Sequence, residues 1–447
     1  MSWINKSDIS NSLKNKLKEI YNNRVQGNQY YIALEPSIKN PDFKNENTYS
    51  NMPYPDSGFR LLSLYRYWNM INYFFPNKDL TNKDWNKVLK EYIPKFINAK
   101  NELEYELVVL QIIGEINDTH ASLWNGGNKI NELRGNNYAP FKVEFIENKL
   151  VVTDYYNPKL QSDAKLKIGD IITHINGRTV KYLVDSLKIY YPASNNAARL
   201  RDISDDILRS SQNSINLQYI SENQNKQNKI NLYSKQKLNM YWSFKVNENM
   251  KCYRMLDGNI GYLTLANIQQ KDIPEIKKIL KDTKGIIIDI RNYPSTFVPF
   301  ALGSFFMSEP TAFVKFTHGN PDNPGEFTYT NNLLIPVDSS YYKGKLVVLV
   351  NEKSQSQAEY TAMAFRSVKN SKIIGSTTAG ADGNVSIILL PGGLSSLISG
   401  IGVYYPDGRE TQRVGIIPDI VVKPTIKGIK EGRDEVLEKA IELLEKQ

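Results

Sequence analysis

The chain has 447 residues, of which 41% are hydrophobic and 23% are charged, a composition typical of globular proteins. This length predicts two or three domains, each with its own core. No apolar run approaches the ~20 residues that a membrane-spanning helix needs, so we expect no membrane span. The net charge of +9 is spread over Lys-rich segments without a dense basic stripe, and we therefore expect no nucleic-acid partner.

Cysteine and histidine are scarce. The single cysteine, Cys252, excludes an intrachain disulfide and a multi-cysteine metal site. The three histidines, His120, His174 and His318, lie far apart and lack the spacing of a metal motif. The sequence therefore predicts no metal site. Residues 1–30 contain no apolar stretch typical of a secretory signal, so the protein is either cytoplasmic or an exported protein supplied without its signal.

The first part of the chain, residues 1–135, predicts an N-terminal helical domain. Residues 1–56 are polar and rich in Asn and Lys, with a short helical pattern around Leu17. Three longer segments then repeat apolar side chains at helical spacing. They cover residues 59–75, 84–99 and 102–116. We expect these helices to pack as a bundle that ends shortly before His120.

Residues 138–236 predict a separate β domain. A β-hairpin is expected around the turn Glu147-Asn148, and residues 164–180 combine a Gly-Asp turn, a strand and an Asn-Gly turn. The other strands and the helix expected here cover residues 141–146, 150–153, 181–190, 215–219 and 229–232. The Asn/Gln/Lys-rich residues 221–227 predict an exposed loop between the last two strands.

Residues 245–447 predict an α/β domain, because short apolar strands alternate with helical segments. The strands cover residues 259–265, 284–290, 345–350 and 372–375, and the helices cover residues 273–280, 300–307 and 433–445. Such alternation requires crossover connections and a sheet covered on both faces. Together the three segments predict a multidomain α+β fold.

Ser356 lies at a strand-to-helix junction, between the apolar run 346–350 and the helix-forming residues 358–368. The N–H groups of a helix's first turn lack internal partners and carry the positive end of the helix dipole. This position suits a serine that attacks a carbonyl and must hold the resulting oxyanion. The alternative is that Ser354 or Ser356 is an ordinary helix N-cap, and spacing alone does not separate the two interpretations.

Taken together, these segments resemble the S41 family of serine peptidases, the C-terminal processing and tricorn-core peptidases. The resemblance covers residues 59–424. It rests on five motifs in order: DTHA at residues 118–121, the PDZ-like segment 164–180, DIRN with a following proline at 289–294, SQSQAE at 354–359 and GIIPD at 415–419. It implies an N-terminal helical domain, a PDZ-like β domain and an α/β peptidase core of the ClpP/crotonase type.

The resemblance implies that Ser356 is the nucleophile. Ala381 stands where one branch of the family carries a lysine. The resemblance therefore implies the tricorn-like branch, in which His120 is the general base. A neutral imidazole can take the serine proton and return it to the leaving amine. Thr119 corresponds to a hydroxyl residue that supports the site. Glu410 is the candidate that orients the histidine, with Gln412 as the alternative.

The resemblance also implies a serine endopeptidase that requires no cofactor and acts on unstructured or C-terminal peptide segments. Its oxyanion donors are the amides of Gln357 and Ser295, although family members commonly carry Gly-Gly where this chain has Ser295 and Thr296. A substrate tail is expected to add as a strand to the PDZ-like domain near Phe141 and Lys142. Export is common in the family. The alternative is a non-catalytic peptide- or ligand-binding protein that retains the fold.

Overall fold

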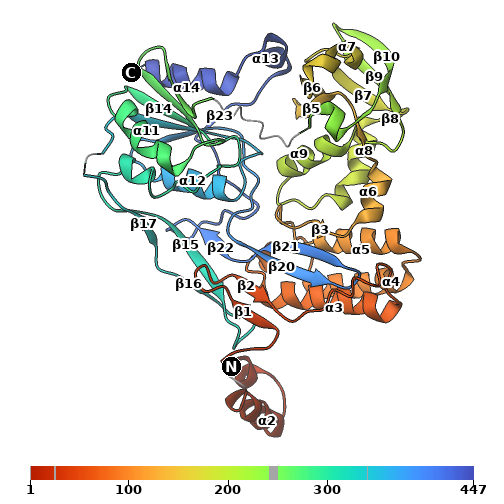
Figure 1. The fold of residues 1–447 in the computed structure, drawn as a ribbon. Coiled ribbons are helices and arrows are strands. Elements are labelled where there is room, and N and C mark those ends of the chain that lie inside the picture. The colour runs from red at the N-terminus through yellow and green to blue at the C-terminus, as the bar shows by residue number, and fades with distance from the viewer. Residues whose placement is uncertain (1, 25–26, 241–249, 340, 447) are drawn as a thin grey trace.

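The computed structural model describes residues 2–24, 27–240, 250–339 and 341–446. They form three packed units and a projecting pair of N-terminal helices, α1 (Ser2–Lys6) and α2 (Asn11–Asn22) (Figure 1). The mixed α and β multidomain class agrees with the prediction. The predicted start of the third domain, residue 245, lies outside the described residues. Among the described residues, no helix has both the length and the apolar character needed to cross a bilayer.

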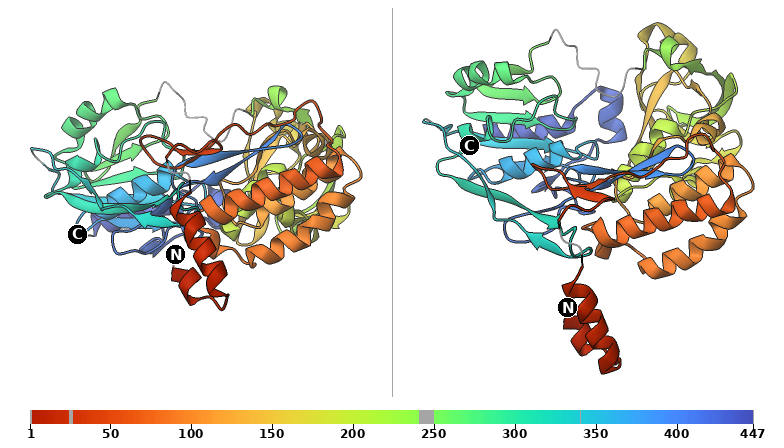
Figure 2. Two further views of the ribbon diagram at one scale, coloured as in Figure 1. Left: turned by 90° about the horizontal axis from the view of Figure 1, so that it is seen from below. Right: turned by 60° about the horizontal axis from the view of Figure 1, so that its bottom comes forward.

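The first unit is a helical layer completed by a hairpin from a distant part of the chain. Its helices are α3 (Ser57–Phe74), α4 (Trp85–Asn98), α5 (Glu102–Gly114) and α6 (Asn128–Arg134), and its strands are β3 (Leu123–Asn125), β20 (Val385–Leu390) and β21 (Leu394–Ser399). Helices α3 to α5 occupy the predicted ranges, and each begins at an Asp or Asn whose side chain accepts an N–H of the first turn. The hairpin β20–β21 packs on the same apolar core (Figure 2). A boundary at residue 135 therefore leaves out strands that complete this core.

The second unit is an antiparallel sheet in the order β10-β9-β7-β6-β5. Its main elements are β5 (Phe141–Ile146), β6 (Lys149–Tyr155), β7 (Ile171–Ile175), β9 (Ser214–Ser221), β10 (Gln224–Asn231), α8 (Val180–Leu187) and α9 (Asn196–Asp206). The predicted hairpin turn is present, with φ of 51° at Glu147 and 61° at Asn148. Helix α9, which the sequence did not predict, is largely polar and packs beside β5.

One expectation for this unit is wrong. Residues 221–227 are not a loop, because β9 and β10 run to Ser221 and from Gln224, so only Glu222 and Asn223 form the turn. Strand β10 lies at the edge of the sheet, where most of its side chains face solvent. A polar composition is compatible with such an edge strand, and because of it the sequence predicted only the end of β10, at residues 229–232.

The third unit is a six-stranded sheet in the order β12-β13-β14-β18-β19-β23, parallel from β13 onward. Its elements are β12 (Tyr253–Leu256), β13 (Ile260–Thr264), β14 (Gly285–Asp289), β18 (Lys345–Val350), β19 (Lys372–Gly375), β23 (Ile420–Val421), α11 (Ile273–Leu280), α12 (Gln357–Arg366), α13 (Ile426–Glu431) and α14 (Glu435–Glu445). Helices α11 and α12 pack in the core on one face of the sheet, and α14 packs on the other. This is the doubly covered sheet that the sequence predicted.

Residues 300–307 do not form the predicted helix. Only the 3₁₀ turn η5 (Gly303–Phe306) is present, and its four residues are buried. The apolar run reflects burial rather than helical periodicity. The strands β15 (Thr311–Gly319), β16 (Phe327–Tyr329), β17 (Leu333–Ile335) and β22 (Gly402–Tyr404) follow, with β15 pairing with the other three. Short elements elsewhere are β1 (Ile32–Leu34), β2 (Pro41–Phe43), η1 (Lys78–Leu80), β4 (Asn137–Tyr138), η2 (Pro158–Leu160), α7 (Gln161–Ala164), β8 (Arg178–Thr179), η3 (Lys188–Tyr190), β11 (Tyr233–Ser234), α10 (Lys235–Leu238) and η4 (Gln270–Asp272).

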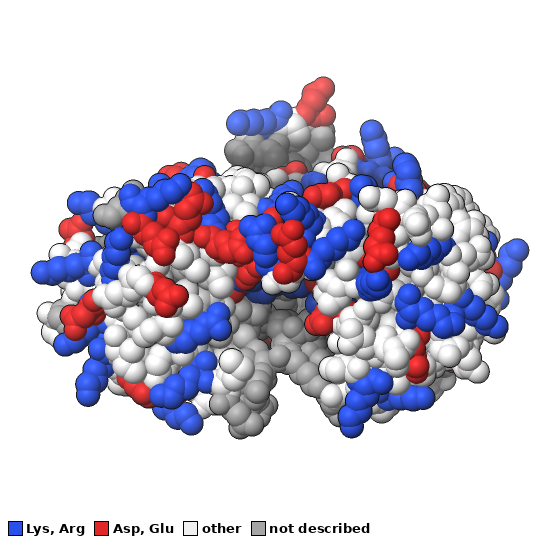
Figure 3. Space-filling view, turned by 90° about the horizontal axis from the view of Figure 1, so that it is seen from above, with Lys and Arg blue, Asp and Glu red and all other residues white. Residues whose placement is uncertain are grey.

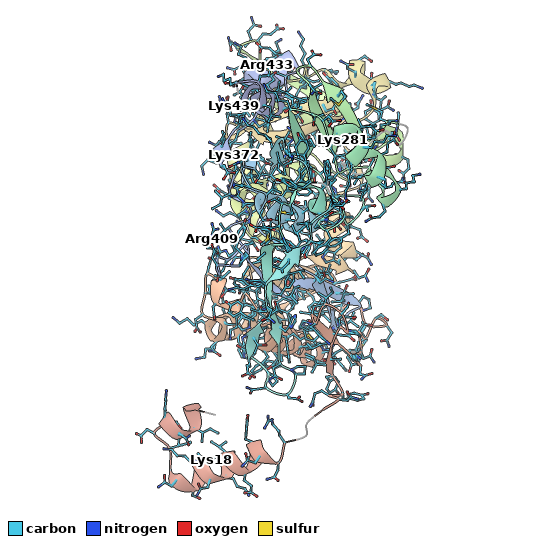
Figure 4. All side chains as sticks on the ribbon, turned by 90° about the vertical axis from the view of Figure 1, so that its left-hand side faces the viewer. Lys18, Lys281, Lys372, Arg409, Arg433 and Lys439 are labelled. Atoms are coloured by element: carbon cyan, nitrogen blue, oxygen red, sulfur yellow. The ribbon has the colours of Figure 1, made fainter. Side chains whose placement is uncertain are left out.

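The surface charge is mixed. On the face seen in Figure 3, Lys and Arg side chains are interspersed with Asp and Glu side chains over both lobes. Cations labelled in Figure 4 lie on separate parts of the molecule, with Lys18 on the projecting helix α2 and Lys372 at the margin of the α/β unit. On the face seen in Figure 3, charges of both signs are therefore interspersed.

Candidate functional site

Ser356 occupies a sharp turn between strand β18 and helix α12. Its backbone has φ 57° and ψ −121°, a conformation that L-residues rarely adopt and that costs on the order of 1–3 kcal/mol. Ser356 is the N-cap residue of α12 and forms a capping box with Glu359, but its backbone lacks the extended conformation of an ordinary N-cap. Strained serines of this kind, on strand-to-helix turns, present their hydroxyl at the end of a sheet.

The turn is held by Glu359, in the first turn of α12. This carboxylate is fully buried and accepts N–H groups of Ser356 (3.2 Å), Gly380 (2.8 Å) and Ala381 (3.0 Å), together with the hydroxyl of Thr378. Burial raises the pKa of Glu359, and these hydrogen bonds oppose that rise. The peptide carbonyl of Ala381 accepts a second bond from the Ser356 N–H at 2.9 Å. Glu359 therefore fastens the nucleophile turn to the loop that follows β19.

The loop after β19 carries no lysine at the site. Ala381, which stands where one branch of the family carries a lysine, is fully buried, and Lys372 is exposed at the start of β19 (Figure 4). Neither the loop nor the strand therefore supplies an amine to Ser356.

His120 lies just beyond helix α5 and is 6% exposed. Its Nδ1 is 2.9 Å from the hydroxyl of Ser399, at the end of β21, and this hydroxyl donates to Asp118 at 3.0 Å. Asp118 also accepts the backbone N–H groups of His120 (3.0 Å) and Ser399 (2.7 Å). Burial lowers the pKa of His120, Asp118 acts to raise it, and the positive charge of Arg201 adds to the lowering. An imidazole that is neutral at physiological pH is the result.

Ser356 and His120 line the same cavity, which has a volume of about 950 Å³. Thr119 and Lys142 line it as well, so the structure brings four of the predicted site residues together. Within the described residues, no direct hydrogen bond joins the side chains of Ser356 and His120. In substrate-free sites such contacts are often long and tighten only when substrate binds.

Thr119 fixes the position of the segment that carries His120. Its hydroxyl donates to the carbonyl of Ala379 at 3.0 Å and accepts the N–H of Ser194 at 2.8 Å, while its own N–H donates to the Ser194 hydroxyl at 2.9 Å. The Ala379 carbonyl lies two residues before Ala381, which contacts Ser356. Thr119 thus joins the helical unit to the loop beside the nucleophile.

Charged side chains of the second unit contact the turn just before Ser356. Lys353 Nζ lies 2.7 Å from Glu144 Oε1 on β5, and Lys142 lies 3.2 Å from the same oxygen. Burial raises the pKa of Glu144, but the two lysines outweigh it and hold that pKa below its ordinary value. Arg201 on α9 donates to the Glu352 carbonyl (2.8 Å) and to Gln355 Oε1 (3.1 Å). The second unit therefore closes one side of the cavity.

One of the predicted oxyanion donors is engaged elsewhere in the fold. The N–H of Ser295 donates to the carbonyl of Leu265 at 2.9 Å and its hydroxyl to that of Ile268 at 2.6 Å. Ser295 is therefore committed to the fold and offers no oxyanion donor. The side chain of Phe141 is 1% exposed and packs in the core of the second unit, whereas its backbone begins the edge strand β5. Gln357 begins α12 directly after Ser356, where the N–H has no intrahelical acceptor.

Among the described residues, no hydrogen bond joins His120 to Glu410 or Gln412, the two residues predicted to orient it. Glu410 is exposed, and its backbone bridges to Tyr404. Gln412 is 5% exposed, but its Nε2 atom has no hydrogen-bond partner among the described residues. The Nδ1 atom of His120 is engaged by Ser399 instead. Asp118 could have been suspected from its place two residues before His120, whereas nothing near Ser399 in the sequence singles it out.

Comparisons with known proteins show similarity in sequence and in fold. Residues 259–422 match the model of peptidase family S41. A carboxy-terminal-processing protease of Bartonella bacilliformis is 29% identical over 203 residues, which cover 41% of this chain and 43% of that relative. The structure of mature CPAF complexed with lactacystin has a TM-score of 0.67 at 14% identity, covering 87% of this chain and 98% of the other. A putative peptidase from Parabacteroides merdae has a TM-score of 0.54 at 16% identity, covering 87% and 97%.

Proposed function

Because the chain carries a domain of peptidase family S41, as its motifs predicted, we propose that it is a serine peptidase in which Ser356 is the nucleophile and His120 the general base. One observation carries the proposal: the strained Ser356 and the buried, neutral His120 line one cavity although 235 residues separate them in sequence. Backbone strain of this kind is concentrated at functional sites, and a serine that shares a cavity with a neutral imidazole fits nucleophilic catalysis better than binding alone.

In this mechanism the Oγ of Ser356 attacks the scissile carbonyl while His120 takes the hydroxyl proton. The oxyanion that forms is stabilised by the N–H of Gln357 at the positive end of α12. The tetrahedral intermediate collapses, the amine leaves with the proton that His120 returns, and an acyl-enzyme remains. His120 then takes a proton from water, which attacks the ester and releases the acid. The proton ends on Ser356, so the site is regenerated.

The substrate we propose is an unstructured or C-terminal segment of a polypeptide. Strand β5 is the terminal strand of its sheet, and Lys142 and Glu144 on it line the cavity beside the nucleophile turn. An extended peptide can add to such an edge through main-chain hydrogen bonds. The PDZ-like character of the second unit is part of this proposal. A tail bound at β5 would reach Ser356 within the same cavity.

A labelled fluorophosphonate tests the nucleophile, because it reacts only with an activated serine. We expect wild-type protein to be labelled at Ser356 and to cleave an unstructured polypeptide, and we expect Ser356→Ala and His120→Ala to do neither while keeping a cooperative thermal unfolding transition. A wild-type protein that is folded and remains unlabelled would favour the non-catalytic binding protein. The commitment of Ser295 to the fold is the observation that favours this second candidate.

A further inference from the structure

The side chains behind His120 form a chain of hydrogen bonds that leads away from the cavity. Ser399 Oγ lies 2.9 Å from His120 Nδ1 and 3.0 Å from Asp118 Oδ1. Ser399 and Asp118 are both fully buried. His120 Nδ1 is itself 3.9 Å from Asp118 Oδ1, which is beyond hydrogen-bond reach. The serine hydroxyl is therefore the direct link between the imidazole and the carboxylate.

The direction of these bonds follows from the number of protons available. All three groups around Asp118, two N–H groups and the Ser399 hydroxyl, are donors, as an ionised carboxylate requires because it can only accept. A hydroxyl has one proton, and that of Ser399 points to Asp118. Ser399 must then accept from His120, which places the ring proton on Nδ1. The Nε2 atom is left with its lone pair free for the proton of Ser356.

From this geometry we infer that Ser399 and Asp118 are the positioning residues of the peptidase site, selecting the tautomer of His120 and stabilising the imidazolium that forms during catalysis. The inference rests on the proposed function and replaces Glu410 in the orienting role. Neither Ser399 nor Asp118 lines the cavity, so both residues act only through His120. The negative charge of Asp118 polarises the Ser399 hydroxyl. The polarised oxygen then stabilises the positive charge that the His120 ring acquires when it takes the proton.

The relay is held by elements far apart in sequence. Asp118 lies in the segment after α5, whereas Ser399 ends β21, where it pairs with Val385 of β20. The N–H of Gly400 donates to Asn384 at 2.7 Å and fixes the end of the strand. The hairpin that completes the helical core thus also delivers the hydroxyl to His120. The charged groups that act on the ring are Asp118 from its own segment and Arg201 from α9.

Steady-state kinetics of Ser399→Ala test the relay. We expect kcat to fall about 10- to 100-fold with KM nearly unchanged, a part of the ~10²–10⁴-fold that a positioned general base contributes. The acidic limb of kcat/KM should move to lower pH, because the imidazolium loses an acceptor at Nδ1. Ser395→Ala is the matched control, because Ser395 is also a buried serine of β21 and pairs with Leu389 of β20. This substitution should leave the activity and the pH profile unchanged.

A double-mutant cycle with Asp118→Asn separates the relay from a purely structural role. If the two residues act through one chain, Ser399→Ala with Asp118→Asn should be about as slow as the slower single variant. Additive losses, or wild-type kcat and pH profile in Ser399→Ala, would overturn the inference. Fluorophosphonate labelling of wild-type protein is measured alongside. Absence of labelling there would refute the proposed peptidase itself, whereas a labelled wild type with an unaffected Ser399→Ala refutes only the relay.

Discussion

The two sides of the cavity are held in different ways. On the nucleophile side, Ser356, the carboxylate that holds its turn and the following helix all lie within residues 354–366. On the base side, His120 is held by a hydroxyl 279 residues away. The nucleophile is positioned by local backbone strain, and the base by a long-range chain of side chains. A short motif can specify the first arrangement, but only the complete fold can specify the second.

The largest effect is expected on the strained side. Ser356→Ala and Ser356→Gly should both abolish turnover, because each lacks the nucleophile, yet they should differ in stability. A protein with Gly at a given position is ordinarily less stable than the same protein with Ala there, by about 0.5–1 kcal/mol. A backbone with φ 57° and ψ −121°, however, strains any residue with a Cβ by on the order of 1–3 kcal/mol. The Gly variant should therefore be at least as stable as the Ala variant in urea unfolding. A Gly variant less stable by the ordinary amount would show that Ser356 is not strained.

If His120 is the general base, its pKa should determine the pH dependence of kcat/KM. Burial lowers the pKa of His120 below its ordinary value of about 6.5, and only the neutral ring accepts a proton. Activity should therefore be complete at neutral pH and fall about tenfold per pH unit once the pH drops below that pKa. The acidic limb of kcat/KM, measured in wild-type protein, should have its midpoint below 6.5. A midpoint clearly above that value would mean that a different group acts as the base.

Glu359 allows the nucleophile side to be weakened without removing the nucleophile. Its carboxylate accepts four donors in a fully buried site. In Glu359→Gln, an amide N–H₂ must face some of those donors, which leaves buried groups unpaired at a cost of about 1–3 kcal/mol. The free energy of unfolding should fall by that amount, and fluorophosphonate labelling of Ser356 should slow. Unchanged stability and labelling would mean that the turn is fixed by the strand and helix alone.

The contrast between the two sides of the cavity also explains which elements and site residues could be predicted from the sequence. The three main helices of the first unit, the hairpin at Glu147 and the parallel core were predicted because their apolar periodicity and turn residues are local signals. Helix α9 and residues 224–228 of strand β10 were missed, since their polar composition hides them. Ser399 could not be found, because a serine in an apolar strand is common and its role depends on which distant segment packs beside it. Glu410 was chosen by motif position, and the fold leaves it exposed.

The smallest effect is expected at Glu410. Its carboxylate is exposed and lies beside Tyr404, whose pKa it helps to raise after the larger effects of burial and Tyr329. Glu410→Gln should change kcat less than about twofold and unfolding by less than about 0.5 kcal/mol, as for surface substitutions in general. It is also the matched control for Glu359→Gln, because the same chemical change is made at an exposed carboxylate. A tenfold fall in kcat for Glu410→Gln would restore Glu410 as the residue that orients His120. Because Glu410 is exposed in this structure, that result would also mean that the residues around His120 rearrange when substrate binds.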